Sequence, residues 1–283
     1  MKKVSFSIIT PTYNRLKSGY LEKCIKSVQQ QSGDNFTFQH IIIDDASTDM
    51  TSDYLNKAKG KYLNLITITN KTNKGTGCNY KIGLASATND YVIFMDDDDM
   101  LPPNSLKTRA KYITENPDVD WFYGKAKWIN ETGKFIPVTY QSKFPDDHFY
   151  ERLIIKNFIH NGTPTISRKT LEDITWPSWL DRTQDYFLWL ELSKPEKKLN
   201  VGFIDDYIFT YRVHQNAYTY RWERNHELTK YKDESHVKIK KTLHSDSLSF
   251  FATTIKEYMD EIKKLKKENI KLKEKLKTKT KSQ

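Results

Sequence analysis

Residues 91–99 have the sequence YVIFMDDDD, an apolar run that leads directly into four consecutive carboxylates. Uninterrupted apolar runs of this length are typical of strands buried on both faces of a parallel sheet. Three earlier runs have the same character: Val4–Thr10, His40–Asp44 and Leu63–Thr69. Three intervening segments mix polar and apolar residues as surface helices do: Leu21–Gln31, Thr51–Lys59 and Gly77–Ala87. The alternation predicts an α/β fold, with a mostly parallel sheet flanked by helices.

The pattern changes after Met100. A helix is expected over Pro102–Glu115, with proline in its first turn. Further strands are predicted at Val119–Tyr123, Lys125–Ile129, Val201–Asp205 and Ile208–Val213.

Length and charge limit the classes of function. The chain has 283 residues and a net charge of +10, and its 37% hydrophobic residues are sufficient for one large domain or for one domain with an appendage. Thr254–Gln283 contains 11 lysines and 5 acidic residues, so most of the positive charge lies in this tail. We therefore expect no nucleic-acid binding by the main domain. The two cysteines cannot form a disulfide framework, and no apolar run is long enough for a signal peptide or membrane span. We expect a cytoplasmic protein, at most peripheral at the inner membrane face.

Polar residues follow the predicted strands of the first half where each strand ends. They form four groups: Thr10–Asn14, Asp44–Asp49, Asn73–Gly75 and Asp96–Asp99. Open α/β sheets bind ligands beyond the carboxyl ends of their strands, so these groups are predicted to form one rim.

Each rim group has a functional and a structural interpretation. The four acids would repel one another unless a cation or solvent compensates them, and Mg²⁺ prefers such oxygen ligands. They also suit a solvated turn that caps the next helix. Asp45 is placed to accept hydrogen bonds from a nucleoside, whereas Ser47 and Thr48 suit a helix N-terminus. Lys74-Gly75-Thr76-Gly77 suits a phosphate, but it matches neither a P-loop nor the dinucleotide-binding fingerprint.

In order and spacing, these motifs resemble the inverting GT-A glycosyltransferases of family 2. The similarity is close over about the first 105 residues and looser to about residue 216. It implies a GT-A type, Rossmann-like catalytic domain over residues 1–220, with residues 1–105 binding the nucleotide sugar and residues 106–220 the acceptor. Ala46 stands where the family usually has glycine, which predicts a negative φ at this position.

The resemblance assigns site residues position by position. Nucleotide binding is implied for Pro11, Thr12, Tyr13, Asn14, Asp45, Lys74, Gly75, Lys81, Asp96 and Asp97. Asp98 and His214 are implied as ligands of a divalent Mn²⁺ or Mg²⁺ ion, and Arg212 as a diphosphate contact. Tyr80-Lys81 stands where the family usually has Arg-Asn, so Lys81 would replace an arginine as a point charge only.

The acceptor half is expected to supply a general base. Gln184-Asp185 stands where the family usually has Glu-Asp at a helix start, which makes Asp185 the candidate. The alternative is an ordinary first-turn carboxylate favoured by the helix dipole. Acceptor contacts are expected from His160, Trp179 and Tyr186, although an aromatic side chain at helical spacing also suits a core.

The implied activity is transfer, with inversion, of a hexose or N-acetylhexosamine from a UDP-linked donor. The acceptor would be a hydroxyl of a glycan, a lipid-linked molecule or a polymer, in surface polysaccharide, teichoic-acid or glycoprotein glycan synthesis. Two alternatives remain at this point. One is a glycoside hydrolase with paired carboxylates. The other is a nucleotide-sugar or polyanion-binding scaffold without turnover.

Residues 221–283 are predicted to form a helical region with a basic, coiled-coil-like tail over residues 254–280. Apolar positions three and four residues apart form a heptad seam, and Asn269 occupies an a position. The pattern predicts a homodimer through this coiled coil. A single amphipathic helix packed on its own domain, or a basic helix on an anionic membrane, would show the same pattern.

Overall fold

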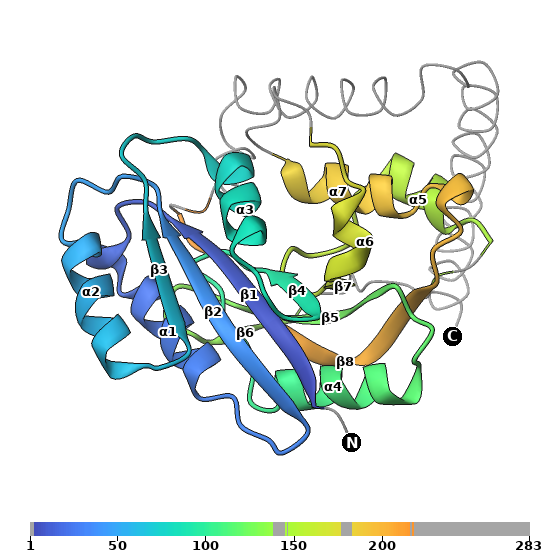
Figure 1. Ribbon diagram of the computed structural model, residues 1–283, viewed down its shortest axis with the longest axis horizontal. Helices are drawn as coiled ribbons and strands as arrows, with labels where there is room; N and C mark the ends of the chain where they lie inside the picture. Colours follow the sequence, from blue (N-terminus) through green and yellow to red (C-terminus); the bar gives the residue numbers. More distant parts are fainter. Residues whose placement is uncertain (1–2, 138–144, 146, 177–182, 216, 218–283) are drawn as a thin grey trace, which may run out of the picture. The chain divides into compact units, whose positions relative to one another are not determined.

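The computed structural model describes residues 3–137, 145, 147–176, 183–215 and 217. The predicted helical region over residues 221–283, with its coiled coil, lies outside the described residues. Within them the fold is α/β, with helices on a mostly parallel central sheet, as the sequence predicts (Figure 1).

The first half alternates strands and helices as expected. Its elements are β1 (Val4–Thr12), a 3₁₀ turn (Leu16–Ser18), α1 (Tyr20–Gln29), β2 (Phe36–Asp44), α2 (Thr51–Lys61), β3 (Leu65–Thr69), α3 (Thr76–Ala85) and β4 (Tyr91–Phe94). The second half has α4 (Ser105–Glu115), β5 (Trp121–Ile129), β6 (Phe135–Ile136), α5 (Phe149–Ile155), β7 (Thr165–Ser167), α6 (Arg168–Glu172), α7 (Gln184–Leu192), a second 3₁₀ turn (Pro195–Lys197) and β8 (Val201–Arg212).

The strand order of the eight-stranded sheet is β3-β2-β1-β4-β7-β5-β6, and β8 pairs with β5. Strands β1 to β4 are parallel where they pair, and so are β5 and β8. The short strand β7 is antiparallel to both of its neighbours, β4 and β5. It therefore joins two parallel sections into one sheet.

Two pairs of predicted strands are single strands in the structure. The predicted strands on either side of Gly124 form β5, and those on either side of Asp206 form β8. The register between β5 and β8 shifts on both sides of Lys125, and Asp205 to Tyr207 are exposed there. This irregularity interrupts the apolar pattern of each strand without ending it.

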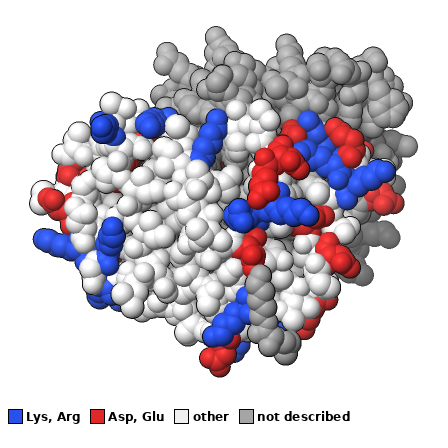
Figure 2. Space-filling view, viewed as in Figure 1, with Lys and Arg blue, Asp and Glu red and all other residues white. Residues whose placement is uncertain are grey.

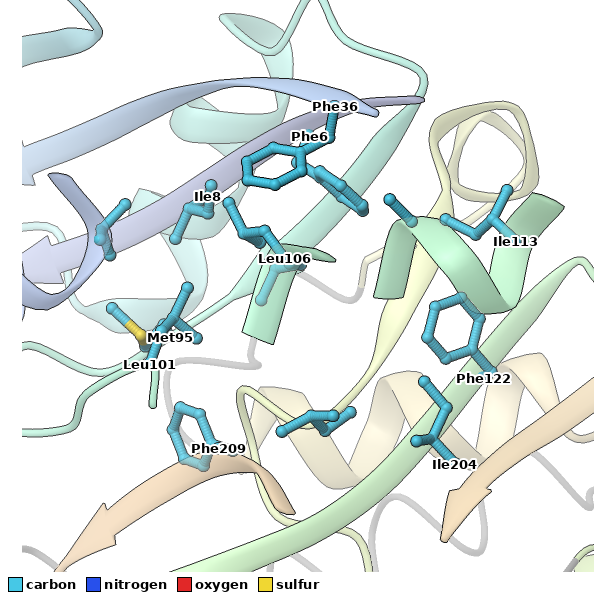
Figure 3. Close-up of a cluster of buried hydrophobic side chains, with 14 of the residues drawn as sticks. Phe6, Ile8, Phe36, Met95, Leu101, Leu106, Ile113, Phe122, Ile204 and Phe209 are labelled. Atoms are coloured by element: carbon cyan, nitrogen blue, oxygen red, sulfur yellow. The ribbon is translucent and has the colours of Figure 1, made fainter. Parts of the chain in front are cut away.

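A buried cluster joins the two halves of the described chain (Figure 3). Ile8 of β1 and Leu106 of α4 belong to the same cluster as Phe122 of β5 and Phe209 of β8, and each is at most 1% exposed. The predicted nucleotide-binding and acceptor halves therefore share one core.

Charged side chains of both signs are interspersed on the face shown in Figure 2, and its central area is largely uncharged. This face has no continuous basic surface among the residues drawn in colour.

Gly83 allows α3 to lie close to β1 and β2. A Cβ atom on Gly83 would lie 2.3 Å from Cγ2 of Ile9 and 3.0 Å from Cδ1 of Ile43. We expect Gly83→Ala to destabilise the protein by about 1–3 kcal/mol through overpacking, measured by urea unfolding. Gly60 of α2 is the matched control, since nothing lies within 4 Å of a Cβ there. Gly60→Ala should stabilise the helix by up to about 1 kcal/mol. Equal effects of the two substitutions would contradict the packing explanation.

His40 is fully buried in β2 and lies 3.0 Å from Oγ1 of Thr10. Burial lowers the pKa of His40 to about 3. The unfolded chain therefore binds a proton at His40 below about pH 6.5 that the folded chain does not bind. Stability contributed by the neutral imidazole is complete above pH 6.5 and falls as the pH drops toward 3.

We expect the advantage of the wild type over His40→Gln to shrink by up to about 1.4 kcal/mol per pH unit between pH 6 and 4. Urea unfolding of both proteins at several pH values measures this difference. A constant difference over that range would show that His40 is protonated in the folded protein.

Candidate active site

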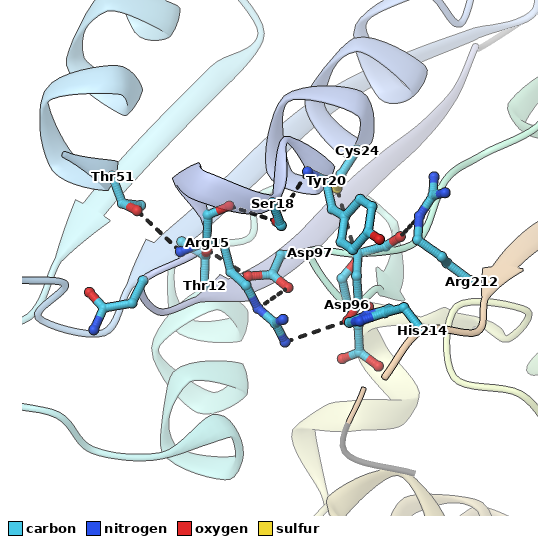
Figure 4. Close-up of polar contacts among 12 residues, drawn as sticks. Thr12, Arg15, Ser18, Tyr20, Cys24, Thr51, Asp96, Asp97, Arg212 and His214 are labelled. Carbon is cyan, nitrogen blue, oxygen red and sulfur yellow. Dashed lines mark hydrogen bonds and ion pairs between the residues drawn. The ribbon is translucent and has the colours of Figure 1, made fainter. Parts of the chain in front are cut away.

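The ends of β1, β2 and β4 bring the first-half motifs together. Oγ1 of Thr12 donates to Oδ2 of Asp97 at 2.6 Å, and the backbone nitrogen of Asp45 donates to the carbonyl of Thr12 at 2.9 Å. The predicted common rim is therefore present, and Figure 4 shows its centre. Pro11 pairs with Ile43 in the β1–β2 register next to this rim.

Asp45 holds the loop that precedes α3. Its buried carboxylate accepts from the backbone nitrogens of Lys74 at 2.8 Å and Gly75 at 2.9 Å, and from Nδ2 of Asn70 at 2.8 Å. Gly75 has φ of +80°, in the region that glycine adopts readily. Asp45 thus holds the loop in shape. Its carboxylate oxygens can each accept more than one hydrogen bond, so the predicted contact with a nucleoside would add to these bonds.

Asn14 connects the end of β1 to the start of α2. Its Oδ1 accepts from the backbone nitrogens of Thr48 at 2.8 Å and Asp49 at 3.3 Å, and its own backbone nitrogen donates to Oγ of Ser47 at 2.9 Å. Asn14 therefore positions this turn. Tyr13 beside it is 45% exposed, so its ring has an open surface.

The prediction of a negative φ at Ala46 was wrong, because Ala46 has φ of +61°. Hydrogen bonds on either side hold this turn, one from the nitrogen of Asp45 to Thr12 and one from the nitrogen of Ser47 to Oδ1 of Asp44. Tertiary contacts thus compensate a conformation that costs a non-glycine residue about 1–2 kcal/mol.

The first two acids of the cluster have different partners. Asp96 accepts from the hydroxyl of Tyr80 at 3.1 Å and from Nδ2 of Asn161 at 3.2 Å. Asp97 accepts from Thr12 and lies 3.1 Å from Nε of Arg15. Burial raises the pKa of Asp96 to about 6, and Asp98 contributes to that rise. Burial also raises the pKa of Asp97 to about 7, although Arg15 opposes the rise.

The other two acids face β8. Oδ2 of Asp98 lies 2.9 Å from Nε2 of His214 and 3.4 Å from Nη2 of Arg15. Burial favours a higher pKa for Asp98, but the hydrogen bond from His214 and the charge of Arg15 outweigh it and lower the pKa. Asp99 accepts from the backbone nitrogen of Arg212 at 2.8 Å, and burial raises its pKa well above the ordinary value. Asp98 is therefore the acid of the cluster whose pKa is lowered.

Arg212 contacts the backbone of the acid cluster. Its Nε donates to the carbonyl of Asp98 at 2.9 Å, its guanidinium lies 4.6 Å from the ring centroid of Tyr20, and the residue is 2% exposed. The ring of His214 packs on the same tyrosine at 4.8 Å. Arg212 thus supports the backbone of Asp98, and its predicted contact with a diphosphate stays a prediction.

Asp98 and His214 fit a divalent cation as a pair. A carboxylate and an imidazole are both ligand types for Mn²⁺, and Mg²⁺ is commonly held by one or two carboxylates together with phosphate oxygens. In the described part of the chain, no three or more His, Cys, Asp and Glu side chains are arranged to hold an ion. The residues therefore fit an ion whose remaining ligands come from a diphosphate and water.

Asp185 lies half-buried in the first turn of α7. Nδ2 of Asn157 lies 3.4 Å from its Oδ2. The pKa of Asp96 is raised by burial, by Asp98 and also by the charge of Asp185. The charge of Asp185 therefore reaches the acid cluster, and its role as the base stays a prediction.

Arg109 of α4 fixes the segment that brings Asn161 to the cluster. It is fully buried, and its guanidinium donates to the carbonyls of Gly162 at 2.7 Å and Thr163 at 2.8 Å. Gly162 has φ of +87°, and a Cβ atom there would lie 2.2 Å from the ring of Phe209. The backbone at Gly162 and Thr163 is therefore held tightly.

The remaining predicted residues lie around this centre. Nζ of Lys81 donates to the carbonyl of Trp176 at 3.4 Å, whereas its neighbour Tyr80 contacts Asp96. His160 accepts from Nε1 of Trp128 at 3.2 Å, and burial lowers the pKa of His160 to about 4. The nucleotide contact of Lys81 and the acceptor contact of His160 stay predictions.

Tyr186 is 1% exposed, and its hydroxyl lies 3.0 Å from the carbonyls of Leu153 and Ile154. This is the placement of a core residue rather than of one that contacts an acceptor, because a buried ring offers no face to a sugar. Trp179 lies outside the described residues.

Three residues of the site were not assigned a role from the sequence. Arg15 directly follows the Pro11–Asn14 motif, and Tyr80 marks the departure from Arg-Asn, so each carried a local signal. Asn161 directly follows the predicted acceptor contact His160, but its contacts join segments 65 and 81 residues apart, so the sequence did not predict them.

Comparisons with known proteins agree with this geometry. The family model described as "Glycosyl transferase family 2" matches residues 7–175. An uncharacterized glycosyltransferase of Methanocaldococcus jannaschii is 25% identical over 85% of this chain and 82% of its own length. The poly(ribitol-phosphate) beta-N-acetylglucosaminyltransferase TarS of Staphylococcus aureus is 33% identical over 64% of this chain. The chain spans only 31% of the length of that relative.

Solved structures share the fold. S. aureus TarS 1–349 in complex with UDP-GlcNAc has a TM-score of 0.60 and 24% identity, covering 76% of this chain and 60% of its own. A mannosyltransferase from Pyrobaculum calidifontis in complex with GDP-Man and Mn²⁺ has a TM-score of 0.58 and 18% identity, covering 79% of this chain and 61% of its own.

Proposed function

The chain belongs to glycosyl transferase family 2, and from this membership we propose that it transfers a hexosyl or N-acetylhexosaminyl group from a UDP-linked donor, with inversion, to a hydroxyl of a surface polymer. Family membership favours the glycosyltransferase over the hydrolase and the scaffold that the sequence alone left open. The name of the TarS relative, a poly(ribitol-phosphate) transferase, supports a polyol-phosphate polymer of the teichoic-acid type as the acceptor. TarS structures with UDP and UDP-GlcNAc support a UDP-linked donor.

One observation carries the proposal: the acid cluster contacts the nucleoside-side loop, and the charge of the candidate base affects the pKa of one of its members. Thr12 connects the Asp45 loop to Asp97. Burial and Asp98 raise the pKa of Asp96, and the charge of Asp185 adds to that rise. A nucleotide sugar bound along this line would present its nucleoside to Asp45 and its anomeric carbon toward Asp185.

The donor side of the mechanism is to bind the nucleotide and its diphosphate. The exposed ring of Tyr13 offers a stacking surface for the base, next to the Asp45 loop. Asp98 and His214 would hold a Mn²⁺ or Mg²⁺ ion, which supplies positive charge for the departing diphosphate. Arg15, 3.4 Å from Asp98, adds a second positive charge at the same carboxylate.

The acceptor side of the mechanism is proton transfer. Asp185 would accept the proton of the attacking hydroxyl as general base. Asn157 lies against its Oδ2 and restricts the orientation of the carboxylate. Attack from the Asp185 side, opposite the diphosphate, inverts the anomeric configuration.

A donor and acceptor screen tests the function. The full chain is incubated with Mn²⁺, poly(ribitol phosphate) and, in turn, UDP-GlcNAc, UDP-glucose and GDP-mannose, and the released nucleoside diphosphate is measured. We expect release of UDP that depends on the polymer, and NMR of the product should show the inverted anomer. Release from GDP-mannose alone, or a product with retained configuration, would contradict the proposal.

We also propose that the enzyme is cytoplasmic and that its basic tail brings it to the inner membrane face as a homodimer. In the part of the chain that the structure describes, no helix has the length and apolar character to cross a bilayer. The excess of lysine in Thr254–Gln283 would favour an anionic surface. The full chain should co-sediment with phosphatidylglycerol vesicles and be released by about 0.5 M salt, because salt screens this attraction. Failure to bind the vesicles at low salt would refute membrane contact, and a monomer in analytical ultracentrifugation would refute the dimer.

A further inference from the structure

The orientation of the Asn161 side chain is set by its partners. Nδ2 lies 2.6 Å from the hydroxyl oxygen of Tyr80 and 3.2 Å from Oδ1 of Asp96. Both contacts are made by the amide nitrogen, which donates to these two oxygens. The amide oxygen, Oδ1, therefore points away from the carboxylate.

Oδ1 of Asn161 is buried and has no hydrogen-bond partner among the described residues. An unsatisfied buried acceptor is costly, so native proteins contain few of them. The side chain is not free to turn toward solvent, because Tyr80 and Asp96 hold its amide nitrogen. Arg109 holds the backbone that follows, at Gly162.

The chemistry around this oxygen selects the kind of ligand group that would satisfy it. Asn161 offers an acceptor there, and its amide nitrogen contacts the carboxylate of Asp96. Acceptors and negative charge disfavour a phosphate oxygen and favour an O–H donor. Nucleotide sugars carry such donors on the ribose and on the transferred sugar.

We propose that Asn161 is a donor-recognition residue whose Oδ1 accepts a hydrogen bond from a hydroxyl group of the bound nucleotide sugar, next to Asp96. The inference rests on the proposed function, and it adds a specificity-determining contact to it. Tyr80 takes part by fixing the amide. In this chain two neutral side chains, Tyr80 and Asn161, contact Asp96, and Tyr80 stands where the family usually has an arginine.

Binding to UDP and to UDP-GlcNAc, each with Mn²⁺, is the test, measured by calorimetry on the full chain. Asn161→Ala should weaken binding by about tenfold, as the loss of one hydrogen bond of about 1.4 kcal/mol would. If the ribose supplies the hydroxyl, both ligands weaken equally. If the sugar supplies it, UDP-GlcNAc weakens and UDP does not.

Tyr80→Phe is the matched variant. It removes a hydrogen bond to the same oxygen of Asp96 but keeps Oδ1 of Asn161. We expect it to weaken binding less than Asn161→Ala does. Asn116→Ala controls for the loss of an asparagine, because the Asn116 side chain donates only to a carbonyl at the exposed end of α4. It should bind as the wild type does.

A ligand-side measurement keeps the test independent of folding. Deoxygenated ligands, 2′-deoxy-UDP and UDP-sugars that lack one hydroxyl, are measured with the wild type. One of them should lose about tenfold in affinity, and Asn161→Ala should bind that ligand no more weakly than the wild type does.

Any one of three results would overturn the inference alone. Asn161→Ala could bind the ligands as the wild type does, Asn161→Ala and Tyr80→Phe could lose equal affinity, or the wild type could bind every deoxy ligand with full affinity. If the wild type binds no UDP-linked ligand, the proposed function fails first and the inference fails with it.

Discussion

Asp185→Asn is expected to lower the rate of sugar transfer by about 10²–10⁴-fold, with the affinity for the UDP-linked donor almost unchanged. The carboxamide has nearly the shape of the carboxylate but cannot accept the proton of the acceptor hydroxyl. Asp185 lies in the first turn of α7, whereas the candidate metal ligand Asp98 contacts His214. Turnover is measured by UDP release, and donor affinity by calorimetry.

The competing explanation for Asp185 is a carboxylate that only stabilises a helix start. Asp53 is the matched control, because it is an exposed acid in the first turn of α2. Asp53→Asn should cost about 0.3–1 kcal/mol of stability and leave turnover as it is. If Asp185→Asn behaves in the same way, Asp185 is not the base.

We expect Mn²⁺ to increase the UDP affinity of the wild type. Asp98→Asn is expected to abolish that increase and to lower turnover by about 10³-fold. Asp98 is the acid of the cluster whose pKa is lowered, by His214 and Arg15 against the effect of burial, so it is charged when an ion arrives. An amide at this position is a weaker ligand and places an NH₂ group toward two donors.

Calorimetry of UDP with and without Mn²⁺ measures this effect. Asp118→Asn, in the exposed turn after α4, controls for the loss of one negative charge and should keep the response to Mn²⁺. A response to Mn²⁺ that survives in Asp98→Asn would exclude Asp98 as a ligand.

Much of the first-half fold was predictable because its strands are buried on both faces. Such strands are apolar throughout, so runs such as residues 91–95 are visible without knowledge of their neighbours. The short strand β7 carried no comparable signal. Its three residues, Thr165–Ser167, pair with β4 and β5, which are far away in sequence. The positive φ of Ala46 was missed for the same reason, because contacts outside the turn hold it.

The acid cluster could be located from the sequence, but the roles of its members could not. Four adjacent aspartates look alike in a sequence, and their pKa values differ because Arg15 and His214 approach Asp98 while Asp96 meets neutral partners. The partner residues come from the end of β1 and the turn after it, from α3, from the loop before β7, and from the end of β8 and the residues after it. Only the folded chain shows which aspartate each of them contacts.

The guanidinium of Arg109 contacts mostly main-chain atoms, and this affects how the enzyme could be re-engineered. Carbonyl oxygens are present whatever the side chains, so these contacts fix the backbone path at Gly162 and Thr163 more than the side chains there, whereas Thr165 contacts Arg109 through its hydroxyl. Tyr80 and Asn161 recognise each other through side chains, and they belong to different halves of the chain. A graft of a foreign second half onto residues 1–105 must therefore bring a matching residue for Tyr80, or alter both positions as a pair.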